Sequence, residues 1–477
     1  MGHPPQPNFH HPIAGPKIAV VGAGLAGLTC TYELRRAGLV ATLYEASDRV
    51  GGRCYSLAGF FPGQVVELGG ELIDSQHHTL LNYAREFGLT LEDYAENLGE
   101  GAFYFNQQRY SEATIIEEYR ELLRSMQSDL QRISRAPTAL NHSPIDAELD
   151  GLSIQEYLDR HQAGPLIESF IRAGYQGEYG LPIEEQTCLH FLLVNQDKDL
   201  DQGAFEIFSD ERYHIREGND RIAHHLAEGI QGQIELGMQL VRLSRNGCNQ
   251  IVLTFDQAGK TQEILADAAV ITIPFPVLRH IDLDDSLELP DWKQTMIRSL
   301  DSGTQAKLMI GFKARPWDQP GGSQAMAHSD LSHHQMSWET NVIDASSDRA
   351  VLTSLASGHL GASLETHRSQ GAAEALLQNY DRIYPGAGIA ADRDHSGQLR
   401  AILQQWSDHP LCMGGYACYR PRQLTAFAER EGEAIHNLFF AGEHTNSFHE
   451  WQGFLEGAAI SGIQAAKQIL LRCGVLP

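Results

Sequence analysis

Cysteine is scarce and shows no pattern in this sequence. The 477 residues include seven cysteines, and none of them forms a CxxC or zinc-like pair. An odd, scattered set of thiols argues against a disulfide framework and is typical of a protein that is kept reduced. The histidine-rich stretches SHHQMSW and DSQHH lack cysteine or carboxylate partners at the spacing of metal ligands. We therefore expect a cytoplasmic protein with free thiols and no bound metal.

Long uncharged apolar runs are also missing. No segment reaches the roughly 18 to 20 residues that a membrane-spanning helix requires. The nearest one, GFLEGAAISGIQAAKQILLRCG, is interrupted by Glu456, Lys467 and Arg472. The first 16 residues carry five prolines, two of them adjacent near the start, and no apolar core, so we expect a disordered arm rather than a signal peptide. The sequence predicts no integral membrane segment and leaves peripheral membrane contact open.

Basic side chains are outnumbered by acidic ones. The chain has 36 Lys and Arg residues against 61 Asp and Glu residues, a formal net charge of -25. This balance disfavours nucleic acid and anionic membrane surfaces as partners, whereas a small cationic ligand would be attracted. The chain is longer than a protein with a single hydrophobic core usually is, and its 42% hydrophobic residues can form two such cores. We expect a globular protein of two domains that binds no nucleic acid.

The segment KIAVVGAGLAGLTCTYELRRAGLVATLYEASDRVGGR, residues 17–53, contains the clearest motif. A short β-branched run predicts a buried parallel strand, and the apolar spacing after it predicts a helix. The helix begins inside a glycine turn, so its free N–H groups and positive dipole end can bind a diphosphate. A second strand ends at Glu45, whose carboxylate can accept the ribose hydroxyls. This order predicts a dinucleotide site at Gly22, Gly24, Gly27 and Glu45.

A second glycine pair decides which dinucleotide is bound. Gly51 and Gly52 allow the backbone to bend close to a ligand, and Arg53 can add charge-assisted hydrogen bonds. Glu45 followed by GGR resembles the flavin amine oxidases, a family that includes monoamine, polyamine and L-amino acid oxidases. The resemblance implies that FAD, rather than NAD, is the cofactor, with Gly52 and Arg53 beside it. It also implies an α/β fold, in which a Rossmann-like FAD-binding domain is interleaved with a mixed α+β substrate domain.

The rest of the chain divides accordingly. Helical periodicity dominates from about His78 to Gln202, whereas QLVRLSRNGCNQIVLTF and DAAVITIPFPVLRHI predict strands, with a turn at Asn246 and Gly247. The predicted disordered arm covers residues 1–16. The predicted FAD-binding domain comprises residues 17–77, 212–285 and 416–477. The predicted substrate-binding domain comprises residues 78–211 and 286–415.

A C-terminal block, LFFAGEHT followed by WQGFLEG, strengthens the resemblance. In the family this pattern contributes to the FAD diphosphate and ribityl site, which implies cofactor contacts for Gly442, Glu443 and Phe454. A carboxylate would repel phosphate, so Glu443 must work through ribityl hydroxyls, water or backbone N–H groups. The family also passes a strand under the adenine, where this chain has Val241. A core position for Val241 explains its residue type equally well.

The resemblance also implies the catalytic groups. The segment SGTQAKLMIGF matches the family strand whose lysine holds a water at the flavin N5 edge, and the match falls on Lys307. Phe454 and Tyr416 match the two aromatic walls beside the flavin, with Tyr419 in reserve. Tyr416 also stands where animal monoamine oxidases attach FAD through cysteine. We therefore expect non-covalent FAD, although Cys418 lies two positions away.

The substrate class stays open between amino acids and amines. Glu71, Tyr416, Phe454 and Trp451 are the expected substrate contacts. No arginine follows ELGGELIDS, where venom L-amino acid oxidases clamp the substrate carboxylate, so a clamp would have to come from Arg216, Arg420 or Arg422. The chain nevertheless most resembles bacterial members, among them L-amino acid oxidases and dehydrogenases that favour basic amino acids.

The sequence hypothesis is therefore oxidative deamination of a basic L-amino acid such as L-arginine, narrowly ahead of a mono-, di- or polyamine. The acidic surplus suits a substrate with a second positive group, which Glu71, Asp210 or Glu211 could receive. The electron acceptor is oxygen, with hydrogen peroxide as product, or a quinone-like molecule. A catalytically silent flavin-bearing binding protein is the alternative of another class. A homodimer is compatible with the sequence, which does not determine the oligomeric state.

Overall fold

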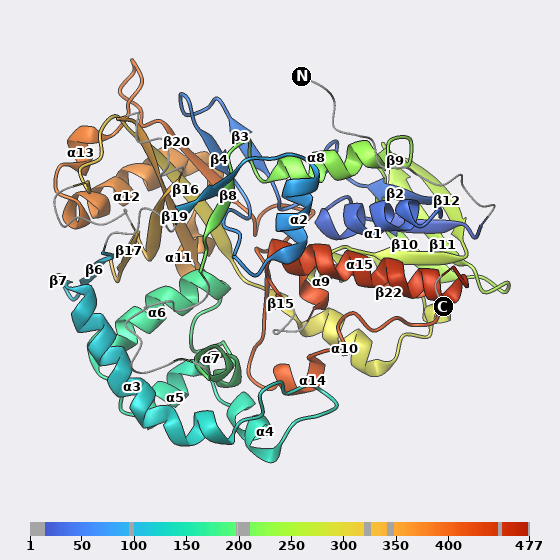
Figure 1. Cartoon of the computed structure of the whole chain (residues 1–477), viewed down its shortest axis with the longest axis horizontal. Helices are drawn as coiled ribbons and strands as arrows, with labels where there is room; N and C mark the ends of the chain where they lie inside the picture. Colours follow the sequence, from blue (N-terminus) through green and yellow to red (C-terminus); the bar gives the residue numbers. More distant parts are fainter. Residues whose placement is uncertain are drawn as a thin grey trace.

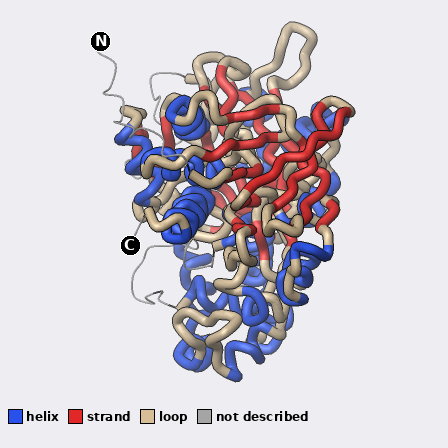
Figure 2. The backbone as a smooth tube through the Cα atoms, turned by 90° about the vertical axis from the view of Figure 1, so that its right-hand side faces the viewer, coloured by secondary structure: helices blue, strands red, loops and turns tan. Residues whose placement is uncertain are grey.

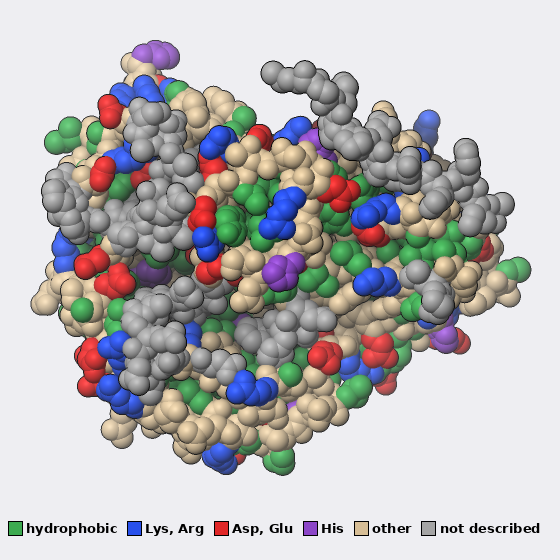
Figure 3. All heavy atoms as spheres, in the orientation of Figure 1, with side chains coloured by type: hydrophobic (Ala, Val, Ile, Leu, Met, Phe, Trp, Pro, Cys, Tyr) green, Lys and Arg blue, Asp and Glu red, His purple; other side chains and the backbone are tan. Residues whose placement is uncertain are grey.

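The computed structural model describes residues 15–94, 100–196, 198, 210–318, 326–340, 348–446 and 451–475. Nearly all of the expected N-terminal arm lies outside these residues. Figure 1 shows two regions that contain sheets and, below one of them, a helical region. Among the described residues, no helix is both long and apolar enough to cross a bilayer. Figure 3 shows acidic and basic side chains interspersed over one face of the molecule.

A five-stranded parallel sheet forms the centre of the first region. Its strand order is β22-β13-β1-β2-β9. The short apolar runs predicted at the start of the chain form its buried middle strands. The members are β1 (Ile18–Val21), β2 (Ala41–Glu45), β9 (Ile234–Leu236), β13 (Ala268–Ile271) and β22 (Leu438–Phe440). Strands from three distant parts of the sequence therefore end at the same edge of one sheet.

Helices α1 (Leu25–Arg36) and α15 (Leu455–Arg472) pack against each other beside this sheet (Figure 1). Gly462 makes the close approach possible, because a Cβ atom at this position would lie 2.3 Å from the carbonyl oxygen of Ala26. The C-terminal helix is thereby fixed against the helix that follows the glycine turn.

The second sheet-containing region is built on a seven-stranded mixed sheet of order β20-β16-β19-β18-β17-β6-β7. The strands are β6 (Ala102–Phe105), β7 (Gln108–Tyr110), β16 (Gln305–Phe312), β17 (Ala327–Ser329), β18 (Met336–Thr340), β19 (Ala350–Ser357) and β20 (Ala401–Gln405). Every residue of β16 is buried. Its even-numbered residues from Ala306 to Phe312 pack in one apolar cluster with helix α12 (Ser369–Ile383). Because strand side chains alternate, the odd-numbered residues of β16 face the other side.

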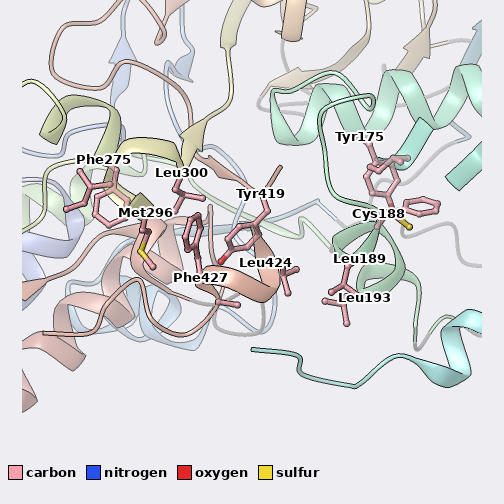
Figure 4. Packing of buried hydrophobic residues seen from close by; sticks show 14 of the residues in the cluster. Tyr175, Cys188, Leu189, Leu193, Phe275, Met296, Leu300, Tyr419, Leu424 and Phe427 are labelled. Atoms are coloured by element: carbon pink, nitrogen blue, oxygen red, sulfur yellow. The ribbon is translucent and has the colours of Figure 1, made fainter. Parts of the chain in front are cut away.

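The helical region contains α3 (Glu112–Arg132), α4 (Pro144–Asp150), α5 (Ile154–Arg160), α6 (Pro165–Tyr179) and α7 (Cys188–Asn195). Figure 2 shows these helices gathered at one end of the molecule, away from most of the strands. Ser143 and Ser153 begin α4 and α5 with capping boxes, which satisfy N–H groups that the helices leave free. A second apolar cluster includes residues of all five helices and extends to Tyr419, which Figure 4 shows beside Leu424 and Phe427.

A further sheet, of order β12-β11-β10-β14, contains the predicted hairpin. Strands β10 (Gln239–Arg245) and β11 (Ile251–Gln257) are joined by a five-residue loop rather than by a two-residue turn. The side chain of Asn246 accepts hydrogen bonds from the N–H groups of Cys248 and Gln250, which stabilises the longer loop. The segment DAAVITIPFPVLRHI was expected to be strand throughout. Its second half instead forms helix α9 (Phe275–Leu278), which begins directly after Pro274.

The remaining described elements are the two outer strands of this sheet, β12 and β14, and the helices and short strands elsewhere in the chain. They are β3 (Ser56–Ala58), β4 (Val65–Glu67), α2 (His78–Glu86), β5 (Leu91–Asp93), β8 (Tyr213–Ile215), α8 (Asp220–Gly229), β12 (Lys260–Ala266), β14 (Asp282–Leu283), α10 (Asp291–Ser299), β15 (Asp301–Ser302), α11 (Gly358–Ser363), α13 (Ala387–Ala390), β21 (Ala417–Cys418) and α14 (Leu424–Phe427), with 3-10 turns at Asp285–Leu287, Thr366–Arg368 and Glu443–Thr445.

Candidate active site

A cavity of about 950 Å³ runs between the two sheet-containing regions. Its walls come from the glycine turn after β1, the GGR segment, the bulged strand β10, strand β16 and the segment before α15. One part is lined by glycines and by the end of β2, and another by carboxylates and aromatic rings. The distant segments singled out in the sequence therefore meet around one space.

The three glycines of the first turn have different roles. Gly22 has φ +106°, and a Cβ atom there would lie 2.4 Å from Thr272 Oγ1. Gly24 borders the cavity, and a Cβ atom there would have no neighbour within 4 Å. Gly27 does not line the cavity; its missing side chain lets α1 approach the turn, because a Cβ atom would lie 1.9 Å from the Gly22 carbonyl oxygen. Gly27 therefore shapes the turn from behind instead of contacting a ligand.

Glu45 is held in place at the cavity wall. Its Oε2 accepts the N–H of Ala23 at 2.7 Å, and its Oε1 accepts the N–H and the hydroxyl of Ser47, each at 2.8 Å. A carboxylate oxygen has two lone pairs, so Oε2 can still accept a hydroxyl. The side chain is thus oriented before any ligand binds, as a ribose site requires.

Arg53 and Glu443 pair with each other across 390 residues of sequence. Arg53 Nη1 lies 2.9 Å from Glu443 Oε1 and also donates to the carbonyl oxygen of Gly415. Glu443 Oε2 accepts the N–H of Ala417 at 3.2 Å. The guanidinium therefore offsets the negative charge that made Glu443 an improbable neighbour for phosphate.

Three further cofactor positions also border the cavity. Gly52 has φ +59° and lies against Gly24. Gly442 has φ +137° and donates its N–H to Ser461 Oγ at 2.8 Å. Val241 occupies a β-bulge in β10, where the register shifts between Leu240 and Arg242. The bulge turns Val241 towards the cavity, so this side chain is not simply part of the core.

Arg49 is a cavity residue that the sequence reasoning missed. Its guanidinium donates to the carbonyl oxygen of Gly52 at 2.7 Å and lies 4.0 Å from the centre of the Tyr55 ring. The only signal in the sequence is an arginine two positions before the glycine pair.

These residues fit FAD. The open space at Gly24 and the first turn of α1 can receive the diphosphate, and Glu45 can receive the ribose hydroxyls. Arg49 and Arg53 supply positive charge on the same side of the cavity.

Lys307 faces the cavity from the buried strand β16. Its side chain lies on the odd-numbered face, opposite the cluster with α12, and the residue is only 7% exposed. The ammonium donates to Glu71 Oε2 at 2.6 Å and to the carbonyl oxygen of Glu67 at 3.1 Å. A buried ammonium with these partners is not a surface lysine, which agrees with the role that the family resemblance implies.

Glu71 lines the cavity, where a substrate contact was expected, and it also binds Lys307. Besides Lys307, its carboxylate accepts Trp338 Nε1–H at 2.9 Å and the Thr340 hydroxyl at 3.1 Å. The residue is 5% exposed. With these three donors the carboxylate anchors the lysine, and because Glu71 also lines the cavity, its contact with substrate stays a prediction.

Two of the four aromatic candidates line the cavity, and the other two do not. Tyr416 and Phe454 both line the cavity, and the Tyr416 hydroxyl donates to the carbonyl oxygen of Glu178. Trp451 does not line it: φ is +65° at this residue, and its ring packs edge-on against His77 at 4.6 Å. Trp451 was expected to contact the substrate, but in the structure it packs against His77 instead. The reserve candidate Tyr419 is buried in the core and donates to Glu431.

An acidic group lines the cavity beyond Lys307. It consists of Glu178, Asp210 and Glu211. Burial and the nearby Asp74 raise the pKa of Glu178 to about 7. Burial, together with Glu178 and other carboxylates, raises the pKa of Glu211 well above its usual range. Unlike the other two, Glu178 was missed in the sequence; the available signal is an acidic residue in the last turn of α6, where the helix dipole disfavours it.

Lysine and arginine contribute three side chains to the cavity wall. Arg49, Arg53 and Lys307 line the cavity, and every Arg and Lys of the sequence lies within the described residues. The arginines considered as a carboxylate clamp lie elsewhere. Arg420 pairs with Glu185 and Asp301, Arg216 pairs with Glu92, and Arg422 does not line the cavity.

Acid denaturation of the flavin-loaded protein should release all of the flavin into the supernatant. Cys54 and Cys412 line the cavity, but burial raises the pKa of both thiols and keeps them protonated. Cys418 is buried outside the lining. Flavin absorbance after precipitation measures the release, and a pellet that stays yellow in denaturant would contradict it.

Comparison with known proteins gives consistent results. The sequence profile described as flavin-containing amine oxidoreductase matches residues 25–470. An L-amino-acid oxidase of Pseudechis australis is 24% identical over 471 residues, covering 95% of this chain and 87% of its own. A putative L-amino-acid oxidase of Bacillus subtilis (strain 168) is 23% identical, covering 95% and 94%.

Solved structures share the fold. Putrescine oxidase bound to putrescine superimposes with a TM-score of 0.77 at 19% identity, covering 96% of this chain and 99% of its own. Cyclohexylamine oxidase from Brevibacterium oxydans IH-35A gives a TM-score of 0.79 at 16% identity, with the same coverage. The expected architecture is confirmed.

Proposed function

Because the chain belongs to the family of flavin-containing amine oxidoreductases, we propose that it oxidatively deaminates a primary amine that carries a second, distal cation. A basic L-amino acid such as L-arginine is the first candidate. FAD, when bound, supplies the acceptor for the hydride that leaves the carbon next to the amine. The imine product takes up water to give a 2-oxo acid and ammonia. Oxygen, reduced to hydrogen peroxide, or a quinone-like acceptor removes the electrons.

The observation that carries this proposal is the acidic group of Glu178, Asp210 and Glu211 on the cavity wall. Carboxylates clustered away from water are unfavourable unless a cation joins them. A guanidinium or ammonium at the far end of the substrate would supply this charge. A substrate with a neutral tail would leave the carboxylates unpaired.

Two observations bear on the substrate carboxylate in opposite directions. Relatives that align with 95% of the chain are L-amino-acid oxidases, which favours an amino acid. However, no arginine other than Arg49 and Arg53 lines the cavity, and both lie on the side that fits the nucleotide. The missing clamp favours a di- or polyamine, which we keep as the second candidate.

The protein's own residues position the substrate and exclude water. Tyr416 and Phe454 provide aromatic walls that can restrict the orientation of the bound amine. The buried pair of Lys307 and Glu71 holds donors and acceptors at a fixed place in the wall.

Four related substrates test the proposal. L-arginine, L-citrulline, agmatine and N-carbamoylputrescine differ only in the carboxylate and in the charge of the tail. We expect the kcat/KM of each substrate with a cationic tail to exceed that of its neutral counterpart by about tenfold or more, which corresponds to ~1.4 kcal/mol. Equal rates for arginine and citrulline would overturn the distal-cation proposal. Faster turnover of agmatine than of L-arginine would make the amine the preferred substrate class.

Replacing Glu178 with glutamine should reduce the preference for a cationic tail by about tenfold. Because the pKa of Glu178 is raised to about 7, its carboxylate becomes charged as the pH rises through that value. The kcat/KM ratio of L-arginine to L-citrulline should therefore rise between about pH 6 and about pH 8 in the wild type and stay flat in Glu178→Gln. The ratio cancels the ionisation of the reacting amine. A ratio independent of pH in the wild type would contradict the prediction.

A further inference from the structure

A line of charged side chains leads from the surface to the ammonium of Lys307. Arg216 Nε lies 2.7 Å from Glu92 Oε1, and Glu92 Oε2 lies 3.7 Å from His214 Nδ1. On its other side, His214 Nε2 lies 3.1 Å from Glu67 Oε1. The carbonyl oxygen of Glu67 then accepts the ammonium of Lys307 at 3.1 Å.

The inner pair of this line is fully enclosed. Glu67 and His214 are each 0% exposed, and neither lines the cavity. They therefore do not contact substrate or cofactor directly. Replacing such a pair by apolar residues is often no less stable, so stability alone does not explain its presence.

Glu67 ties down the segment that carries Glu71. Its Oε1 also accepts the N–H of Asn219 at 2.9 Å, and its Oε2 accepts the Ser56 hydroxyl at 2.7 Å. The Asn219 side chain in turn donates to the carbonyl oxygens of Gly70 at 3.1 Å and Glu71 at 2.6 Å. The segment 67–71 carries both acceptors of the Lys307 ammonium, namely the Glu67 carbonyl oxygen and the Glu71 carboxylate. The Glu67 carboxylate fixes one end of this segment directly and the other end through Asn219.

The charges alternate along the line. Burial lowers the pKa of His214, but the carboxylates of Glu67 at 3.1 Å and Glu92 at 3.7 Å outweigh burial and raise the pKa to about 9. The carboxylates facing the imidazole are Glu67 on β4, Glu92 on β5 and, further away, Glu71, and the ring of Tyr94 stacks on it at 6.1 Å. At neutral pH an imidazolium therefore separates Glu67 from Glu92.

We propose that His214 and Glu67 form a positioning ion pair, which fixes the ammonium of Lys307 and the carboxylate of Glu71 for both half-reactions of the flavin. His214 acts only through Glu67 and the segment 67–71. Neutralising either partner should therefore disturb flavin chemistry while substrate affinity stays nearly unchanged.

The test compares His214→Gln, Glu67→Gln and the double variant with the wild type, using flavin-loaded protein. Each single variant should lose about tenfold or more in the limiting rate of flavin reduction, with KM changed by less than about twofold. In the double variant two neutral amides can bond to each other, so most of the rate should return. His225→Gln, on the outer helix α8, is the matched control and should retain the wild-type rate.

A second measurement requires no amine. Reoxidation of dithionite-reduced flavin by oxygen should show the same pattern across the four proteins. If no amine bleaches the wild-type flavin, the proposed function fails while this comparison still tests the ion pair. Wild-type rates in flavin-loaded single variants, or losses that multiply in the double variant, would overturn the positioning role.

A third readout uses the protein without flavin. Because the folded pKa of His214 is about 9, above its ordinary value, the stability it contributes is complete below the ordinary value and is lost as the pH rises through about 9. The wild-type melting temperature should therefore fall more steeply across this range than that of His214→Gln. Parallel curves would show that the imidazole carries no charge, which would also overturn the proposal.

Discussion

Replacing Lys307 with methionine should lower the limiting rate of flavin reduction by about 10²-fold or more, with the flavin still bound. The ammonium is the only side-chain cation on the part of the cavity wall formed by β16, and methionine keeps much of its length. Anaerobic mixing with substrate and measurement of flavin absorbance give the rate. A rate within about threefold of wild type would remove Lys307 from the catalytic machinery.

The variant also leaves a buried carboxylate behind. Glu71 keeps Trp338 and Thr340 but loses the ammonium at 2.6 Å. Breaking a buried pair in this way typically costs ~3–5 kcal/mol in the free energy of unfolding. The double variant Glu71→Gln with Lys307→Met is the control, because it removes the uncompensated charge. If activity is lost in both and stability returns in the double variant, the loss is chemical.

Replacing Gly24 with valine should give a folded but colourless protein. The backbone at Gly24 has φ -71° and ψ 179°, which valine adopts readily, and a Cβ atom there meets no protein atom within 4 Å. The added methyl groups would instead project into the space that fits the diphosphate. We expect a far-UV spectrum like that of the wild type and flavin content reduced at least about tenfold.

Substitutions at two other glycines are the controls for this result. Gly371, in α12, has equally open surroundings but lies away from the cavity, so Gly371→Val should keep its flavin. Gly27→Val should fail to fold properly, since even a Cβ atom would lie 1.9 Å from the Gly22 carbonyl oxygen. A yellow Gly24→Val protein would show that the diphosphate does not bind at this turn.

The sequence predicted those parts of the site that depend on local order along the chain. A strand, a glycine turn, a helix and a strand ending at Glu45 must place that carboxylate at the turn, and they do. Lys307 was identified from the family resemblance, and strand alternation in the structure places it on the face of β16 opposite the apolar cluster. The pairing of Glu71 with Lys307 joins residues 236 positions apart, and nothing local distinguishes this from a free carboxylate.

Other differences have equally physical causes. Trp451 was assigned to the cavity from its place in the motif, but its backbone conformation directs the ring to His77. Glu178 could not be found from periodicity, because only the folded contact between α6 and the cavity gives it a role. Such partners are decided by tertiary packing, on which local patterns carry little information.

The packing of α15 on α1 has a consequence for biosynthesis. A ribosome that has produced the first 437 residues has made the glycine turn, Glu45 and Lys307, yet has not made β22, Glu443 or α15. Until these last elements emerge from the exit tunnel, α1 lacks its neighbour and Arg53 lacks its carboxylate. Flavin binding should therefore be complete only after α15 has emerged, and until then the edge of β13 that pairs with β22 stays open.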